Sequence, residues 1–186
     1  SETYFPIYAK AQELAMPILF HTGLIAAGKP YDGKTVHAFG PENMRPIHLA
    51  GVAEAFPELL ILAGHQGYPY LEETEHNLYY YKNIHGDISG YLRSTPRLNE
   101  VLDRRAHDGT ERFFNEKLHF ATDEFYGNKL SNDRAIRLVT FWTSYFEFVG
   151  GLYYRWGLAA EQEKFFHGNA ESLRERFLRG SNSCGS

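Results

Sequence analysis

Short apolar runs that end in polar residues recur along this chain, and longer segments with helical spacing of apolar residues separate them. The apolar runs are PILFHT (17–22), LLILAGH (59–65), IHGDIS (84–89) and KLHFATD (117–123). The helical segments cover residues 45–56, 70–82, about 93–107, 131–148 and about 169–178. This alternation predicts βα units around a parallel sheet, whose strands read as continuous apolar runs because helices cover both faces.

Local signals support the predicted helices. Pro46 suits the first turn of the first helical segment, where a missing N–H costs nothing. Ser131 or Asn132 can cap the fourth segment. Residues 23–44 form a long connection that contains Gly and Pro, and a loop of this length in a compact domain is usually functional or mobile.

Three of the four predicted strands end in residues that can do chemistry: His21, His65 and Asp123. Alternation of side chains along each strand places His21 on the face of Leu19 and His65 on the face of Ala63. The carboxyl ends of parallel strands meet at one edge of a sheet, and ligands bind outside that edge. We therefore expect all three residues at this edge.

Histidine and aspartate are the ligands that a divalent metal of the zinc class prefers. A metal-bound water can lose a proton near neutral pH, a carboxylate beside it can ligate or act as a base, and a second histidine can polarise a carbonyl or move a proton. Taken singly, each of the three residues also has a structural explanation, as a hydrogen-bonded loop histidine or a turn-capping aspartate. The residue pattern leaves the catalytic and structural explanations open.

Other polar residues are weaker candidates. The remaining histidines are predicted to be surface or packing groups (His48, His76), solvated groups (His107, His167), satisfied core groups (His85, His119) or a pocket residue in the long loop (His37). Arg45 and Tyr68 could bind an acidic substrate, although little singles them out. The sequence contains no G-x-S-x-G, P-loop, G-x-G-x-x-G or H-E-x-x-H motif and no cysteine pair for zinc.

The composition narrows the class of protein. The chain has 186 residues, which suits one domain, with 43% hydrophobic and 23% charged residues, as in ordinary globular proteins. A net charge of -4 gives no basic field for nucleic acid. The single cysteine, Cys184, cannot form an internal disulfide. No apolar stretch approaches the roughly 20 residues that span a bilayer, and no signal-peptide pattern is present. We therefore expect a cytoplasmic protein with a small-molecule substrate, without nucleic-acid or membrane partners.

Five stretches of the chain together resemble a known family. Their order and spacing resemble the fifth to eighth barrel strands and closing helix of the amidohydrolase superfamily, in particular the amidohydrolase-related branch that includes aminocarboxymuconate-semialdehyde decarboxylase-like enzymes. The stretches are MPILFHTG (16–23), FPELLILAGHQGYPYLEE (56–73), NIHGDISGY (83–91), LHFATDEF (118–125) and HGNAESLRERF (167–177). Each motif is weak by itself, and the ordered set is more specific.

The resemblance implies a metal-dependent (β/α)8 barrel that hydrolyses, or non-oxidatively decarboxylates, a small carboxylated substrate. His21 matches the family's metal-ligand histidine on strand five. Asp123 matches the strand-eight aspartate, which binds metal and helps to activate water. His65 matches the strand-six histidine, which acts mainly on the substrate in this branch. The implied cofactor is a divalent metal, zinc first and manganese second. Tyr70 stands where relatives often carry Trp.

One part of the family pattern is missing. The family's first strand carries an H-x-H pair of metal ligands, and this sequence contains no H-x-H. A complete barrel takes about 250 residues, and the chain lacks an initiator Met, so we expect residues 1–180 to be the second half of a barrel and 181–186 a flexible tail. Such a half would pair with its missing N-terminal half or self-associate through exposed strand edges. The alternative is an inactive fragment that serves as a structural or binding module.

Overall fold

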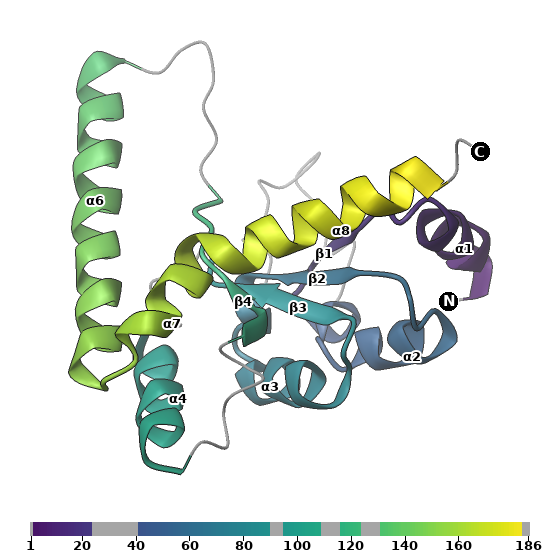
Figure 1. Ribbon diagram of the computed structural model, residues 1–186, viewed down its shortest axis with the longest axis horizontal. Helices are drawn as coiled ribbons and strands as arrows, with labels where there is room; N and C mark the ends of the chain where they lie inside the picture. The colour runs from purple at the N-terminus through teal and green to yellow at the C-terminus, as the bar shows by residue number, and fades with distance from the viewer. Residues whose placement is uncertain (1, 24–40, 90–94, 109–115, 124–130, 184–186) are drawn as a thin grey trace, which may run out of the picture.

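A parallel sheet of four strands forms the centre of the protein (Figure 1). The computed structural model describes residues 2–23, 41–89, 95–108, 116–123 and 131–183. The strands lie side by side in chain order: β1 (Ile18–His21), β2 (Ile61–Gly64), β3 (Ile84–Asp87) and β4 (Leu118–His119). All three pairings are parallel, which confirms the predicted sheet. The strands are shorter than the predicted runs, because each run continues into a turn at its carboxyl end.

Helices connect the strands, as the alternation predicts. The helical elements are η1 (Glu2–Tyr4), α1 (Phe5–Glu13), η2 (Pro41–Met44), α2 (His48–Ala55), η3 (His65–Gly67), α3 (Leu71–Tyr80), α4 (Thr95–Asp108), α6 (Asn132–Arg155), α7 (Ala159–Glu163), η5 (Lys164–Gly168) and α8 (Asn169–Ser183). Ser131 caps α6, because its side chain accepts a hydrogen bond from the Arg134 N–H at 3.3 Å. Pro46 lies before α2 and not in its first turn. Helix α8 extends through Ser183 into the predicted tail, and residues 184–186 lie outside the described residues, as does most of the loop 23–44.

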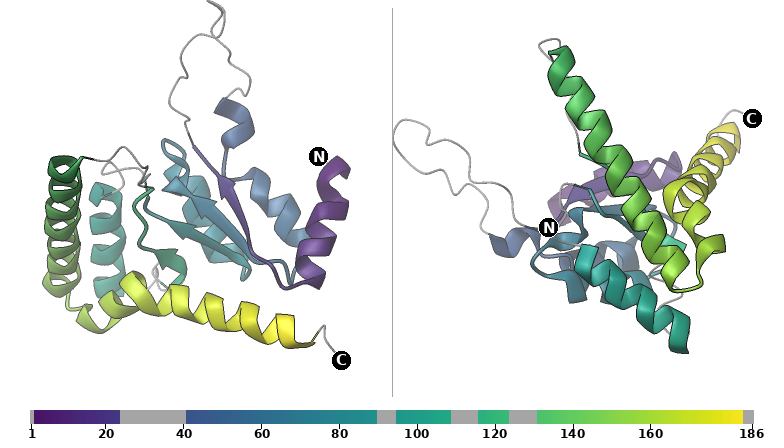
Figure 2. Two further views of the ribbon diagram at one scale, coloured as in Figure 1. Left: turned by 90° about the horizontal axis from the view of Figure 1, so that it is seen from above. Right: turned by 90° about the vertical axis from the view of Figure 1, so that its left-hand side faces the viewer.

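The two faces of the sheet have different environments. On one face, Ile61, Ala63 and Ile84 are buried in the hydrophobic core beneath α2 and α3. The opposite face carries Leu19 and, aligned with it across the strands, Leu62. Helix α8 crosses this second face (Figures 1 and 2). The side chain of Leu19 is nevertheless 65% exposed, so α8 covers the second face only in part.

Helix α6 stands beside the sheet as a long, separate element (Figure 2). One side of it is anchored by the buried residues Tyr145, Val149 and Tyr153, which belong to the main hydrophobic cluster. Along the rest of α6, large apolar side chains such as Ile136 and Val139 are exposed. None of the described helices is both long and apolar enough to cross a membrane.

Candidate active site

The carboxyl edge of the sheet gathers polar residues from neighbouring strands. The strand register aligns His21 with Gly64 and Asp87 with His119. The His21–Gly64 pair lies next to the Asp87–His119 pair, because a Cβ added at Gly64 would lie 3.7 Å from Asp87 Oδ2. These positions follow from parallel pairing, since the same edge collects the end of every strand. The edge where the sequence predicts a site is thus the edge where these polar residues lie together.

His65 reaches this edge through a left-handed turn. Strict alternation of side chains along β2 would place His65 on the same face as Ala63, which is buried in the core beneath the helices. His65 and Gln66 instead adopt φ values of 69° and 51°. Asp87 Oδ1 accepts the His65 N–H at 3.0 Å and holds the turn. The result is that the imidazoles of His65 and His21 lie 4.5 Å apart between ring centroids.

Asp123 is less favourably placed for a shared site than His21 and His65. It is exposed, has a φ of 56°, and is the last described residue before 124–130. Among the described parts of the chain, no group of three or more His, Cys, Asp or Glu side chains could hold a metal ion. The structure therefore brings together His21 and His65 of the three predicted residues. Imidazole and carboxylate are suitable donors for a zinc-class metal. The described residues, however, do not bring together the three or more donors that such a metal needs.

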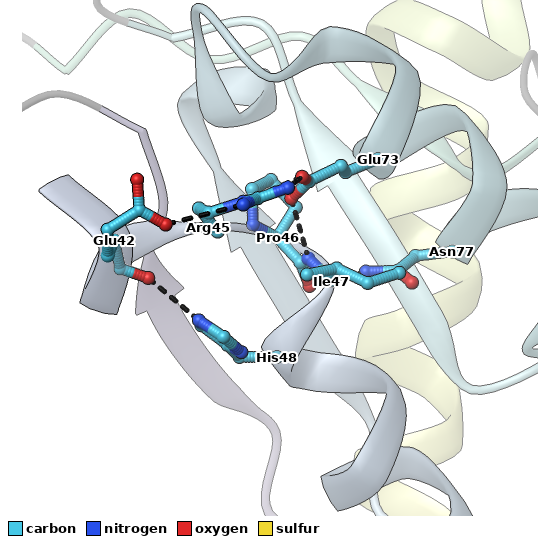
Figure 3. A network of polar contacts seen from close by, with 7 residues as sticks. All are labelled: Glu42, Arg45, Pro46, Ile47, His48, Glu73 and Asn77. Carbon is cyan, nitrogen blue, oxygen red and sulfur yellow. Dashed lines mark hydrogen bonds and ion pairs between the residues drawn. The ribbon is translucent and has the colours of Figure 1, made fainter.

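Arg45 is engaged by carboxylates of its own chain (Figure 3). Its Nε donates to Glu73 Oε1 at 2.8 Å, and its Nη1 donates to Glu42 Oε2 at 3.3 Å. The hydrogen bonds that Arg45 donates to Glu73, and then to Glu42, raise the pKa of Arg45 further above its ordinary value. Glu73 Oε2 also accepts the Ile47 N–H at 3.2 Å. This network ties the segment before α2 to α3, so Arg45 has a structural role here.

Tyr68, the second weak substrate candidate, is half-buried next to the turn that carries His65. Its backbone packs closely against Gly23, where a Cβ would lie 2.5 Å from the Tyr68 carbonyl oxygen. Gly23 has a φ of 83° and follows β1, so Tyr68 lies at the same edge as His21. Tyr68 is therefore positioned at the rim of the candidate site.

Asp87 and Ser89, which are not among the candidate residues predicted from the sequence, both contact His65. Ser89 Oγ lies 3.0 Å from His65 Nδ1, and Ser89 O lies 3.2 Å from the same nitrogen. Ser89 is buried and its hydroxyl contacts Asp87 Oδ1. A signal was present, because Asp87 and Ser89 end the third predicted strand, which lies between the strands of His65 and Asp123.

A second pair of histidines lies deeper in the sheet. His85 Nδ1 and His119 Nε2 are 3.1 Å apart, and His119 is only 7% exposed. Burial lowers the pKa of His85 to about 3, and electrostatic repulsion from the protonated form of His119, from Lys117 and from Arg176 adds to this shift. Burial also lowers the pKa of His119 to about 4, although Asp87 opposes this shift. Both imidazoles are therefore neutral at pH 7, as expected for core groups.

A family model matches most of the chain. Residues 1–173 match the family model described as "Amidohydrolase", so the protein is a member of the amidohydrolase family. The architecture is a TIM-barrel-type α/β fold, which the parallel sheet and a solved relative both support. That relative is an uncharacterized TIM-barrel protein from Bordetella bronchiseptica, with a TM-score of 0.58 and 20% identity over 95% of this chain and 51% of the other.

A 2,6-dihydroxybenzoate decarboxylase, solved in complex with 2,6-dihydroxybenzoate, is also similar. It gives a TM-score of 0.48 and 16% identity, and the match covers 93% of this chain and 55% of the decarboxylase. Among curated proteins no sequence matches the chain. The chain thus spans about half the length of the solved proteins that it resembles.

Proposed function

We propose that this chain supplies part of the active site of a metal-dependent amidohydrolase-type enzyme, which hydrolyses or non-oxidatively decarboxylates a small carboxylated substrate. The observation that carries the proposal is the approach of His21 and His65, whose rings lie 4.5 Å apart at the carboxyl edge of neighbouring strands. Ligands bind at this edge in TIM barrels. Membership of the amidohydrolase family supports the same class of chemistry.

In this proposal His21 and Asp123 are metal ligands, and His65 and Asp123 are catalytic groups. Tyr68 lies at the rim and is the better placed of the two substrate-binding candidates, since Arg45 is already paired with Glu73. The described residues do not form a group of three donors. Metal binding therefore requires further donors, and we derive no chemical step through a metal from this chain alone.

The missing donors would come from another part of a barrel. We infer that the four strands correspond to the second half of an eight-stranded barrel, which agrees with coverage of about half of the TIM-barrel relative. The exposed side chain of Leu19, on the face opposite the core, would then point into the barrel interior, where side chains normally pack in layers. A second copy of the chain is the other candidate to cover the exposed face that carries Leu19.

The alternative function is that of an inactive structural or binding module. The observation behind this alternative is that the sequence contains no H-x-H pair, the pair of metal ligands that the family resemblance implies for a first barrel strand. The two proposals differ in metal content and in turnover, so a single set of variants separates them.

The test measures bound zinc and manganese by elemental analysis, in this chain and in the natural protein that contains it, together with turnover of a panel of aromatic and aliphatic carboxylates. We expect His21→Ala and Asp123→Ala to lower metal content at least tenfold in the natural protein. His76→Ala is the matched control, because His76 is exposed on α3, away from this edge. Unchanged metal content in both variants would refute the ligand assignment. A metal-free, inactive natural protein would support the inactive module.

A further inference from the structure

The carboxylate of Asp87 organises the turn that carries His65. One oxygen, Oδ1, accepts three hydrogen bonds: from the His65 N–H at 3.0 Å, from the Ser89 N–H at 2.8 Å, and from the Ser89 hydroxyl. The bond from the His65 N–H ties the His65 main chain to Asp87 in a left-handed conformation, which an L-residue adopts only at a cost. Asp87 therefore fixes the position of the main chain from which the His65 side chain extends.

The same contacts determine which ring nitrogen of His65 carries the proton. A carboxylate and a carbonyl oxygen accept hydrogen bonds and cannot donate them. The single hydroxyl proton of Ser89 is donated to Asp87, so it is not available for His65. Two oxygens of Ser89, its hydroxyl and its carbonyl, lie 3.0 and 3.2 Å from His65 Nδ1. A proton on Nδ1 satisfies both oxygens, whereas a lone pair on Nδ1 would face the lone pair of the carbonyl.

We propose that Asp87 and Ser89 are positioning residues that hold the neutral His65 imidazole as its Nδ1–H tautomer, so that Nε2 carries the lone pair. This proposal rests on the proposed function only for its catalytic meaning. With the lone pair on Nε2, the neutral ring can accept a proton from a substrate or bind a metal at that nitrogen. A tautomer with the proton on Nε2 could only donate there.

The arrangement differs from a nucleophilic serine triad, although it contains the same three residue types. In such a triad the carboxylate contacts the histidine, which takes the proton of the serine hydroxyl. Here Asp87 takes the hydroxyl proton of Ser89, and Ser89 contacts His65 as an acceptor. Ser89 is also only 4% exposed, so a substrate carbonyl has no access to its oxygen. The geometry assigns Ser89 to positioning and not to nucleophilic attack.

Nuclear magnetic resonance tests the tautomer without any need for turnover. In the uniformly ¹⁵N-labelled chain, long-range ¹H–¹⁵N spectra distinguish a protonated ring nitrogen from one with a lone pair, and His65→Gln identifies the His65 signals. We expect His65 to be the Nδ1–H tautomer. His48 gives an internal contrast, because its Nε2 donates to the Glu42 carbonyl at 2.7 Å and so must carry the proton. An Nε2–H tautomer at His65 would overturn the proposal.

Variants test whether Asp87 and Ser89 cause this preference. Asp87→Ala frees the hydroxyl of Ser89 to donate to Nδ1, so we expect at least a twofold fall in the Nδ1–H share of His65. Asp87→Asn retains an oxygen acceptor and should restore most of it. Ser89→Ala is the milder variant if Asp87→Ala does not fold, and it should also lower the Nδ1–H share. If neither alanine variant changes the tautomer, the positioning role is wrong.

The two proposals can fail separately. An inactive or metal-free natural protein with a Nδ1–H tautomer at His65 would refute the proposed function and leave the positioning role intact. Active enzyme with an Nε2–H tautomer at His65 would refute the positioning role alone. In active enzyme we expect Asp87→Ala to lower kcat at least tenfold with a smaller change in KM, and Asp87→Asn to recover part of the loss.

Discussion

Acid should destabilise this protein through the contacting pair of His85, which is half-buried, and His119, which is buried. Both imidazoles are neutral in the folded state, with pKa values lowered mainly by burial to about 3 and about 4. In the unfolded chain both side chains return to an ordinary value of about 6.5. Between these limits the unfolded state binds more protons than the folded state, so the free energy of unfolding falls as the pH decreases.

The size of the effect follows from the two shifts. At about pH 5 each unfolded histidine is protonated and each folded one is not, which costs about 1.5 pH units at 1.36 kcal/mol, or about 2 kcal/mol per residue. His85 and His119 together therefore remove about 4 kcal/mol between about pH 7.5 and about pH 5. This loss is large against the total stability of about 5–15 kcal/mol of a typical domain. The stability that these two neutral histidines contribute is fully present above about pH 6.5. It is lost as the pH falls toward their pKa values in the folded state.

Urea unfolding monitored by circular dichroism at about pH 7.5 and about pH 5 measures the difference. His119→Gln removes one titrating group, so we expect it to reduce the pH-dependent loss by about 2 kcal/mol, whatever its effect on stability at neutral pH. His76→Gln is the matched control, because His76 is exposed and its removal should leave the loss unchanged. The reasoning is refuted if wild type shows no loss, or if His119→Gln retains all of it.

Two further predictions concern the framework around the site. Gly67→Ala should destabilise the fold by roughly 2–3 kcal/mol, because Gly67 has a φ of 68° and a Cβ there would overlap the ring of Pro46. Gly51→Ala, in open space on α2, should stabilise the fold by about 0.5–1 kcal/mol, and thermal melts of both variants measure the two changes. Arg97→Ala should cost about 1–3 kcal/mol in urea unfolding, since it leaves the carboxylate of Glu75, which is 14% exposed, without its main partner. Arg174→Ala, at an exposed ion pair, should cost under about 1 kcal/mol, and equal losses at the two arginines would contradict this account.

The apolar pattern was sufficient to predict the framework of this protein. Four runs of β-type residues separated by helical spacing define four parallel strands in chain order, because each run can bury itself only beneath the helices that follow. The amphipathic pattern also identified α2, α3, α4, α6 and α8, although α6 and α8 continue beyond their predicted ends, and it did not predict α1 or α7. Boundaries such as these depend on caps and on packing with other elements, which a periodic pattern does not encode.

The candidate site was predicted only in part. His21 lies where strand alternation puts it, on the face opposite the core, since a side chain in a regular strand follows from its position in the sequence. His65 does not follow alternation, because it leaves β2 through a left-handed turn. The acceptor that stabilises this turn, Asp87, lies 22 residues further along the chain. Arg45 had the right charge for an acidic substrate, but Glu73, which is 28 residues away, already binds it.

Residue type and local periodicity thus fix which strands form and which of their residues can reach the edge of the sheet. They do not fix the direction of a side chain in a turn or the partner of a charge, because both depend on groups that folding brings from distant segments. The contact between Ser89 and His65 is of this kind, since the two residues follow different strands and their hydrogen bond depends on the parallel register of β2 and β3. The chemistry of the site therefore depends on an interaction that exists only after the sheet has formed.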